Sequence, residues 1–489
     1  MKRTLILILS IYFTTLNCLA QTKDSVKTDY KTVITKKTIT INGKAMSFTI
    51  ETGYLAWKND NDEQKANVFY TSYIKDGEQE GKRPLSFAFN GGPGSSSLWL
   101  HLGCLGPKRI VMDETGNAPA PPYELTNNES SWLDLTDIVF IDPVGTGFSR
   151  PSKGEKDAQF YGYKNDVSSV GEFVRLFLNK QKRWASPKYV IGESYGTTRA
   201  SGLSKYLIDE HGIYLNGIVL ISSTLDFETF REFEHNDLAY TCYLPSITAT
   251  SFYHKKLVPV LQKDLQTSLK KVESFISNYY VNALYKGTLL SQNEKSNIAD
   301  SLSYYTGLSK AYILKSNLRI PSWRYRKELL NDSSLSIGRF DSRLLIPETD
   351  ALDDDCANDA SFTKIRAAFS TSINYYLRSE LKYNNDLPYN IIGNVSPWEY
   401  ANGKYLNTIP DLSEAMIQNP DMKVWIASGY YDLATPFFGA SYAINHANIP
   451  TSLRKNILTS YYEAGHMMYL YKPCLEKLKT DAVIFFQSK

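Results

Sequence analysis

Short stretches with β-branched and apolar residues mark the first part of the chain. Residues 32–41 alternate partly between apolar and polar positions, which predicts a strand. Further short strands are expected at 47–50, 67–74 and 85–89. Because close turn signals separate these stretches, we expect antiparallel hairpins that lead into a sheet.

The pattern then changes to buried strands that alternate with helices. Residues 137–142, 188–191 and 217–221 are short apolar runs, as expected of strands that are buried on both faces. Helical spacing of apolar residues predicts a helix over 167–182, and a second helix is expected to run to about residue 208. This alternation indicates an α/β fold with a mainly parallel central sheet and helices on both faces.

The alternation lapses in the middle of the chain and resumes near its end. Residues 231–415 are rich in Tyr, Lys, Asn and Ser, with amphipathic helix signals near 257–283 and 361–382. The expected elements after this stretch are strands at 424–427 and 457–462 and helices at 437–446 and 475–487.

These changes divide the chain into four parts. Residues 1–20 form a targeting segment, and 21–230 form the first part of the α/β domain. Residues 231–415 are a largely helical cap inserted into it, and 416–489 complete the same sheet.

The targeting segment has the features of a secretory signal peptide. Lys2 and Arg3 precede a mostly apolar run over 5–16, and small residues follow at a cleavage site near Ala20. The apolar run is too short for a comfortable membrane span, and no other run approaches 18 apolar residues. We therefore expect an exported protein, periplasmic or secreted, with no membrane span.

Cysteine usage is compatible with export. A lipoprotein anchored through Cys18 is the less favoured alternative, because the residues before it match the usual small-residue box poorly. Removal of the signal leaves four cysteines, and the sequence does not choose among their three full pairings. They are Cys104, Cys242, Cys356 and Cys474.

Composition narrows the function without defining it. The chain has 489 residues, of which 43% are hydrophobic, which argues against intrinsic disorder. A formal net charge of +3 gives no reason to expect nucleic acid as a partner. No C-x-x-C or H-E-x-x-H spacing occurs, so no metal or other cofactor is expected.

The strongest chemical signal is the sequence Gly-Glu-Ser-Tyr-Gly at 192–196. It matches G-x-S-x-G and lies between a predicted strand and a predicted helix, which is the context of a nucleophile elbow. The alternative is a plain glycine-rich turn. The context favours Ser194 as a nucleophile, which needs a base and an acid that orients the base.

Chain order and strand ends select those partners. In this fold class the acid and then the histidine follow the serine, each just after a later strand. Of the six histidines, His466 directly follows the strand at 457–462, and Asp432 follows the strand at 424–427. His446 lies inside or at the end of a predicted helix, so we favour His466 as the base.

A glycine-rich loop after the strand at 85–89 offers donors for an oxyanion. Its glycines, at 91, 92 and 94, let backbone N–H groups turn toward a ligand. The second donor is expected to be the N–H of Tyr195, the residue after the nucleophile. A phosphate-binding loop is disfavoured because no Gly-Lys-Ser/Thr sequence follows.

Together these segments resemble the serine carboxypeptidase family of α/β-hydrolases, and a bacterial-type member is expected. Five segments carry the resemblance, in the family's order. They are Asn-Gly-Gly-Pro-Gly at 90–94, Asp-Pro-Val-Gly-Thr-Gly-Phe-Ser at 142–149, Gly-Glu-Ser-Tyr at 192–195, Gly-Tyr-Tyr-Asp at 429–432 and Gly-His-Met at 465–467.

The resemblance implies a role for each site residue. It implies Ser194 as nucleophile, His466 as general base and Asp432 as its orienter. It implies the N–H groups of Gly92 and Tyr195 as the oxyanion hole. Binding of the substrate's terminal carboxylate is implied for Asn90, Gly91 and Glu193.

Two positions depart from the family's pattern. The family pairs the counterpart of Glu193 with a second glutamate, and an ungapped count from Gly106 places Cys104 there. Two facing carboxyl groups need a shared proton, so this loss bears on carboxylate recognition. Ser95 stands where the family has a cysteine, which removes one of the family's disulfides.

The resemblance therefore implies an exported serine carboxypeptidase that hydrolyses peptides through an acyl-enzyme. Altered carboxylate recognition keeps open an esterase or acyltransferase with the same triad. A non-catalytic binding protein on the same fold is the third and least favoured interpretation.

Overall fold

The computed structural model describes residues 31–59, 61–78, 81–350, 353 and 355–488. The signal peptide expected at 1–20 and Cys18 lie outside the described residues. Among the described residues, no helix is both long enough and apolar enough to span a membrane.

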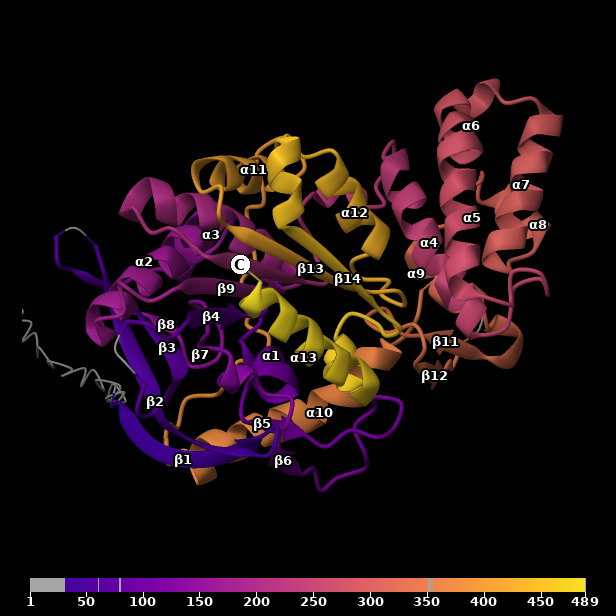
Figure 1. The fold of residues 1–489 in the computed structure, drawn as a ribbon. Coiled ribbons are helices and arrows are strands. Elements are labelled where there is room, and N and C mark those ends of the chain that lie inside the picture. The colour runs from indigo at the N-terminus through magenta and orange to yellow at the C-terminus, as the bar shows by residue number, and fades with distance from the viewer. Residues whose placement is uncertain (1–30, 60, 79–80, 351–352, 354, 489) are drawn as a thin grey trace, which may run out of the picture.

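A ten-stranded mixed sheet forms the centre of the molecule (Figure 1). The strand order is β1-β2-β3-β7-β4-β9-β10-β13-β14, with β8 paired to β3. Pairing is antiparallel from β1 to β7 and parallel from β7 to β14. The mainly parallel sheet is thus confirmed, and so are the expected hairpins of β1 with β2 and of β2 with β3. The strand at 85–89 does not extend them, because β4 pairs in parallel with β7 and β9. The strands are β1 (Val33–Ile41), β2 (Lys44–Lys58), β3 (Gln64–Lys75), β4 (Leu85–Phe89), β7 (Asp137–Ile141), β8 (Arg150–Pro151), β9 (Lys188–Glu193), β10 (Gly217–Ile221), β13 (Lys423–Gly429) and β14 (Ile457–Tyr462).

Helices cover both faces of the sheet, because side chains of a strand alternate between its two sides. Ile138 and Phe140 of β7 pack in the core on one face, and Val139 and Ile141 pack in the core on the other. The first face is covered by α1 (Leu98–Leu100), α10 (Ala360–Tyr375) and α13 (Lys472–Gln487). The second is covered by α2 (Tyr163–Gln181), α3 (Tyr195–His211), α11 (Ile409–Gln418) and α12 (Phe437–Asn445).

A helical group stands beyond the β14 edge of the sheet (Figure 1). Its own core contains Leu269, Val272 and Leu302 and continues to Tyr430 and Phe437 of the sheet domain. Its helices are α4 (Asp237–Tyr253), α5 (Leu265–Phe275), α6 (Val281–Lys286), α7 (Gln292–Thr306), α8 (Lys310–Lys315) and α9 (Ser322–Glu328). Two small hairpins complete the fold, β5 (Lys108–Ile110) with β6 (Leu125–Asn127) and β11 (Leu335–Ile337) with β12 (Leu345–Pro347).

Two helices of the segment 231–415 lie away from this group. Ile365 and Phe369 of α10 pack under the sheet, and Leu412 of α11 packs in the opposite core, with α11 against α3. Amphipathic spacing predicts that such a helix has an apolar face, but it does not say which surface covers that face. The part of the chain expected to cap the sheet therefore also supplies helices to both of its faces.

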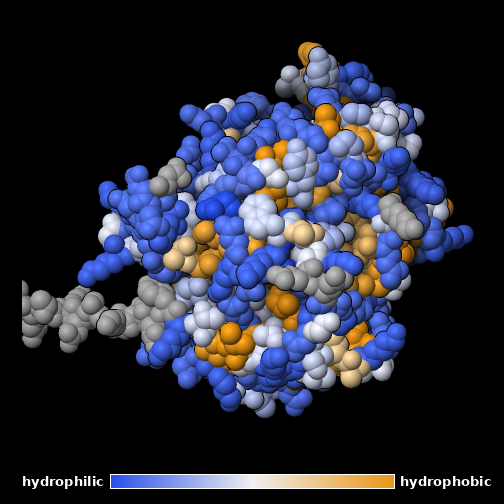
Figure 2. Space-filling view, turned by 60° about the vertical axis from the view of Figure 1, so that its left-hand side comes forward, coloured by the Kyte–Doolittle hydropathy of each residue, from blue (hydrophilic) through white to orange (hydrophobic). Residues whose placement is uncertain are grey.

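The face of the molecule drawn in Figure 2 has no large continuous apolar patch. That face is mainly hydrophilic, and its hydrophobic side chains are confined to small separate patches.

Candidate active site

Ser194 occupies a strained turn between β9 and α3. Its φ of 58° and ψ of −130° lie outside the regions that non-glycine residues favour. Small neighbours make the turn possible, since a Cβ on Gly192 would lie 2.2 Å from the carbonyl oxygen of Gly196. The half-buried Ser194 side chain opens into a pocket. This geometry is that of the expected nucleophile elbow.

Two threonines outside the set of expected site residues fix this turn. The Ser194 carbonyl oxygen accepts from Thr197 Oγ1 at 2.7 Å and from Thr224 Oγ1 at 3.0 Å. The backbone N–H of Ser194 donates to Ile221 O at 2.9 Å. These bonds hold the strained backbone in one conformation.

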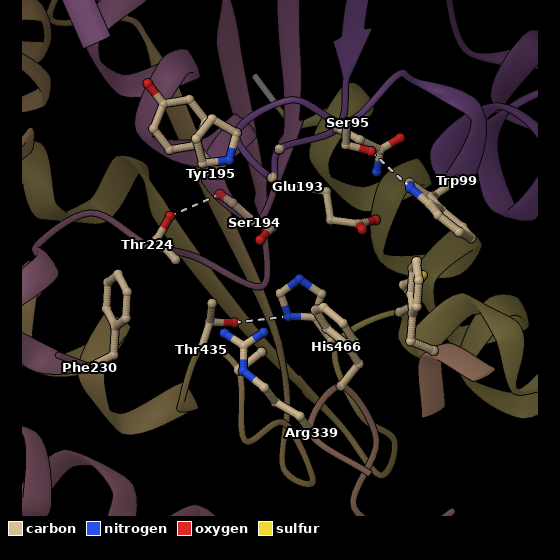
Figure 3. A pocket seen from close by; sticks show the side chains of 18 of the residues that line it. Ser95, Trp99, Glu193, Ser194, Tyr195, Thr224, Phe230, Arg339, Thr435 and His466 are labelled. Atoms are coloured by element: carbon tan, nitrogen blue, oxygen red, sulfur yellow. Dashed lines mark hydrogen bonds between the residues drawn. The ribbon is translucent and has the colours of Figure 1, made fainter. Parts of the chain in front are cut away.

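His466 and Asp432 form a buried pair at the ends of β14 and β13. His466 Nδ1 lies 2.7 Å from Asp432 Oδ2, and the two side chains are 2% and 1% exposed. Asp432 Oδ1 accepts from the N–H groups of Ala434 and Thr435, and Thr435 Oγ1 donates to Oδ2 at 2.6 Å. Figure 3 shows the imidazole beside Ser194, with its other nitrogen, Nε2, on the serine side.

Burial alone would lower the pKa of His466, but the charge of Asp432 and their hydrogen bond raise it above its ordinary value. The carboxylate thus fixes the tautomer with a proton on Nδ1. Nε2 is left free to accept a proton from the side of Ser194.

The segment 339–342, after β11, forms hydrogen bonds with both the loop that carries Asp432 and the loop that carries His466. Phe340 O accepts from His466 N at 2.5 Å, and Arg339 O accepts from Leu433 N at 3.0 Å. The N–H of Ser342 donates to Tyr431 O at 3.0 Å. The turn between β11 and β12 therefore helps to position the histidine, which no sequence signal indicated.

The glycine-rich loop lies against the start of α3. A Cβ on Gly91 would lie 2.4 Å from the backbone nitrogen of Tyr195, so only glycine fits there. Gly92 has a φ of 103°, in the region that favours glycine. Among the described residues, the N–H groups of Gly92 and Tyr195 have no hydrogen-bond acceptor. Both residues line the pocket, so both donors are available to a ligand.

Glu193 and Asn90 lie next to these donors. Asn90 is 1% exposed, and its Nδ2 has no partner among the described residues. Burial raises the pKa of Glu193 to about 7, although the charge of His466, a hydrogen bond from Tyr469 and the adjacent Asn90 amide each lower it. The Tyr469 hydroxyl donates to Glu193 Oε2 at 2.6 Å. Tyr469 was missed because nothing in its local sequence marks it.

Cys104 is buried close to this carboxyl group. Burial raises the pKa of its thiol well above the ordinary value, and the charge of Glu193 adds to the effect. The position where the family has a second glutamate therefore holds a neutral thiol. Tyr469 is the group that donates to Glu193.

The pocket brings seven of the eight expected site residues together and encloses about 190 Å³ (Figure 3). Asp432 lies behind His466, outside the lining.

His446 lies exposed at the end of α12, where its Nδ1 is 2.8 Å from Tyr442 O. In the described part of the chain, no group of His, Cys, Asp and Glu side chains could hold a metal ion, and Cys104, Cys242, Cys356 and Cys474 are unpaired.

The fold and this arrangement of serine, histidine and aspartate define an α/β-hydrolase. The model of the serine carboxypeptidase family matches residues 40–472, and the chain belongs to that family. The family resemblance of the sequence motifs is thereby confirmed.

Curated relatives are distant. Pheromone-processing carboxypeptidase kex1 of Schizosaccharomyces japonicus is 28% identical over 174 residues, covering 35% of this chain and 30% of the relative. Serine carboxypeptidase-like 10 of Arabidopsis thaliana is 31% identical over 204 residues, covering 39% of this chain and 42% of the relative. The chain thus spans less than half the length of these relatives.

One solved structure supports the fold. It is a prohormone-processing carboxypeptidase from Saccharomyces cerevisiae, with a TM-score of 0.53 and 15% sequence identity. The similarity covers 90% of this chain and 91% of that one. It confirms the α/β-hydrolase fold.

Proposed function

We propose that the chain is a serine carboxypeptidase that releases C-terminal residues of peptides. The observation that carries this proposal is the buried pair of Glu193 and Asn90 beside Ser194. The buried amide group of Asn90 and a carboxyl group with a pKa of about 7 together suit a terminal carboxylate.

In this proposal Ser194 Oγ attacks the carbonyl carbon of the last peptide bond. His466 Nε2 accepts the serine proton and then gives it to the leaving amine, while Asp432 holds the imidazole and stabilises its charged form. The acyl-enzyme is hydrolysed by water with the same base. The N–H groups of Gly92 and Tyr195 donate to the oxyanion of each tetrahedral intermediate.

The terminal carboxylate is bound by Asn90 Nδ2, by the backbone at Gly91 and by Glu193. Two negative carboxylates would repel each other, so Glu193 must carry a proton when the substrate binds. Its raised pKa supplies that proton up to about neutral pH.

Preference for a free C-terminus is therefore expected to depend on pH. Below about pH 7 Glu193 is protonated, and a peptide with a free C-terminus should be cleaved at least tenfold faster than its amide. Above pH 7 the ratio should fall as Glu193 ionises. The ratio of kcat/KM for the two peptides, measured from pH 4 to 8, checks this; equal rates throughout would overturn the carboxypeptidase assignment.

Glu193→Gln provides the matched control for this titration. A neutral amide of the same shape cannot ionise, so the free-over-amide ratio should become independent of pH across neutrality. A ratio that still falls near pH 7 in this variant would assign the titration to another group.

Tyr469→Phe is expected to move the same transition upward. The Tyr469 hydroxyl stabilises the ionised form of Glu193, so its loss should raise the pKa of that carboxyl group by about one unit. The midpoint of the free-over-amide ratio should shift toward pH 8. An unchanged midpoint would show that this hydrogen bond has no effect on the proton of Glu193.

Cys104 supports a second candidate, an esterase or acyltransferase with the same triad. The thiol in place of a second carboxyl group alters the carboxylate site. Product analysis with peptide, ester and amine-acceptor substrates separates the two: release of free amino acids supports the peptidase, whereas ester hydrolysis or acyl transfer alone supports the alternative.

Three further expectations belong to this proposal. Export after cleavage of the segment 1–20, to the periplasm or the medium, follows from the sequence pattern. We keep the division of the chain into an α/β domain formed by residues 21–230 and 416–489 and a cap inserted at 231–415. The helices α10 and α11 then belong to the inserted part. A bacterial-type member also stays a prediction, since the relatives named above are fungal and plant proteins.

A further inference from the structure

Two arginine side chains line the pocket without an anionic partner. Arg231 and Arg339 are both part of its lining. Among the described residues, neither guanidinium group forms an ion pair or donates a hydrogen bond, and each rests on aromatic rings instead. The carboxylates of the pocket region are already engaged, Asp432 with His466 and Glu193 with Tyr469.

Hydrogen bonds hold the backbone of Arg339, whose side chain is exposed. Its carbonyl oxygen accepts from Leu433 N at 3.0 Å, and its N–H lies 3.3 Å from both carboxylate oxygens of Asp359. The guanidinium lies 5.2 Å from the ring of Phe340, the residue whose carbonyl oxygen holds His466. Figure 3 shows the side chain reaching up toward Thr435 and His466.

Arg231 supplies a second cation from the start of the helical group. Its guanidinium lies 5.5 Å from the ring of Phe227, 5.6 Å from Phe230 and 5.4 Å from Tyr400. Stacking on three rings holds the group without neutralising it.

Glu232 is close enough to Arg339 for the charge of the guanidinium to lower the pKa of its carboxyl group, but its hydrogen bonds go to Ser322. Glu232 accepts from the backbone N–H of Ser322 at 2.6 Å and from its Oγ at 2.7 Å, and it is not part of the lining. The positive charge of the two arginines is therefore open to a ligand.

The Arg339 guanidinium lies away from Glu193 in Figure 3. Glu193 and Trp99 lie to one side of Ser194, Phe230 and Thr224 lie to the other, and the guanidinium lies below Ser194, beside Thr435. On the proposed function, the leaving residue lies with Glu193, so the opposite side receives the residue before the cleaved bond. We propose that Arg339, with Arg231, selects peptides that carry an acidic side chain at that residue. A side-chain carboxylate accepts two parallel hydrogen bonds from a guanidinium group.

The test uses blocked dipeptides with leucine at the C-terminus and Glu or Gln before it. This pair has the same shape and differs in charge alone, so the ratio of kcat/KM isolates recognition of the carboxylate. The wild-type protein should prefer Glu by about tenfold at pH 6.5 and low ionic strength, and salt should reduce the ratio. Arg339→Gln should bring the ratio close to one, and Arg339→Lys should retain part of it.

Arg366→Gln is the matched control. Arg366 is exposed on α10 and stacks 5.8 Å from the ring of Phe362, a lining residue, but it does not itself line the pocket. This variant should keep the wild-type ratio.

Two results would overturn the inference and leave the proposed function standing. One is a wild-type ratio near one with both dipeptides cleaved. The other is an Arg339→Gln variant that loses preference for free over amidated C-termini and keeps its preference for Glu, since the guanidinium would then bind the terminal carboxylate. If the protein cleaved neither dipeptide, and also failed to cleave one with an apolar residue before the leucine, the result would instead contradict the proposed function.

Discussion

Replacing Ser194 by alanine is expected to lower kcat/KM for peptide hydrolysis by about 10⁵-fold. The substitution removes the hydroxyl group at the strained turn, on the side toward which Nε2 of His466 points. Alanine removes one oxygen and leaves the hydrogen bonds of the Ser194 carbonyl and N–H in place. The thermal unfolding midpoint should therefore change little. Steady-state hydrolysis and calorimetry measure the two effects.

Ser223→Ala is the control for this variant. Ser223 is buried in the loop after β10 and donates to Leu220 O, but it does not line the pocket. It should retain activity within a few fold. A fluorophosphonate probe should label the wild type and Ser223→Ala but not Ser194→Ala. A well-folded wild type that is not labelled would favour a non-catalytic binding protein.

Asp432→Asn is expected to lower kcat/KM by about 10⁴-fold. The Oδ1 of Asp432 accepts from two backbone N–H groups, so an asparagine would keep its oxygen there and place its amide nitrogen near His466 Nδ1. That nitrogen donates, which would force the proton of the imidazole onto Nε2. The histidine could then no longer accept the proton of Ser194.

Asp411→Asn serves as the matched change outside the pocket. Asp411 accepts from the Tyr163 hydroxyl at 2.7 Å, and asparagine can still accept there. Its activity should stay near that of the wild type. If Asp432→Asn were also nearly as active as the wild type, the proposed role of the buried pair would be wrong.

The sequence predicted those parts of the fold that local patterns determine. Short apolar runs such as 137–142 and 217–221 became central strands because such runs must be buried on both faces. The ends of β13 and β14 placed Asp432 and His466 together because parallel strands end at one edge of the sheet.

What the sequence could not predict depends on contacts between distant segments. Tyr469 donates to Glu193, which lies 276 residues earlier, and no periodicity marks a single tyrosine in a 3-10 helix of three residues. The segment 339–342 reaches the His466 loop from the β11–β12 hairpin, in a part of the chain whose own pattern is irregular. The placements of α10 and α11 were open for the same reason: an apolar face does not identify its partner.

The most direct test of the account is a time course of the products from one mixed-sequence peptide with a free C-terminus. Mass spectrometry should show a ladder of products that lose one residue at a time from the C-terminus, present with the wild type and absent with Ser194→Ala. Internal fragments, or an intact peptide under conditions where an ester substrate is hydrolysed, would contradict the assignment as a carboxypeptidase.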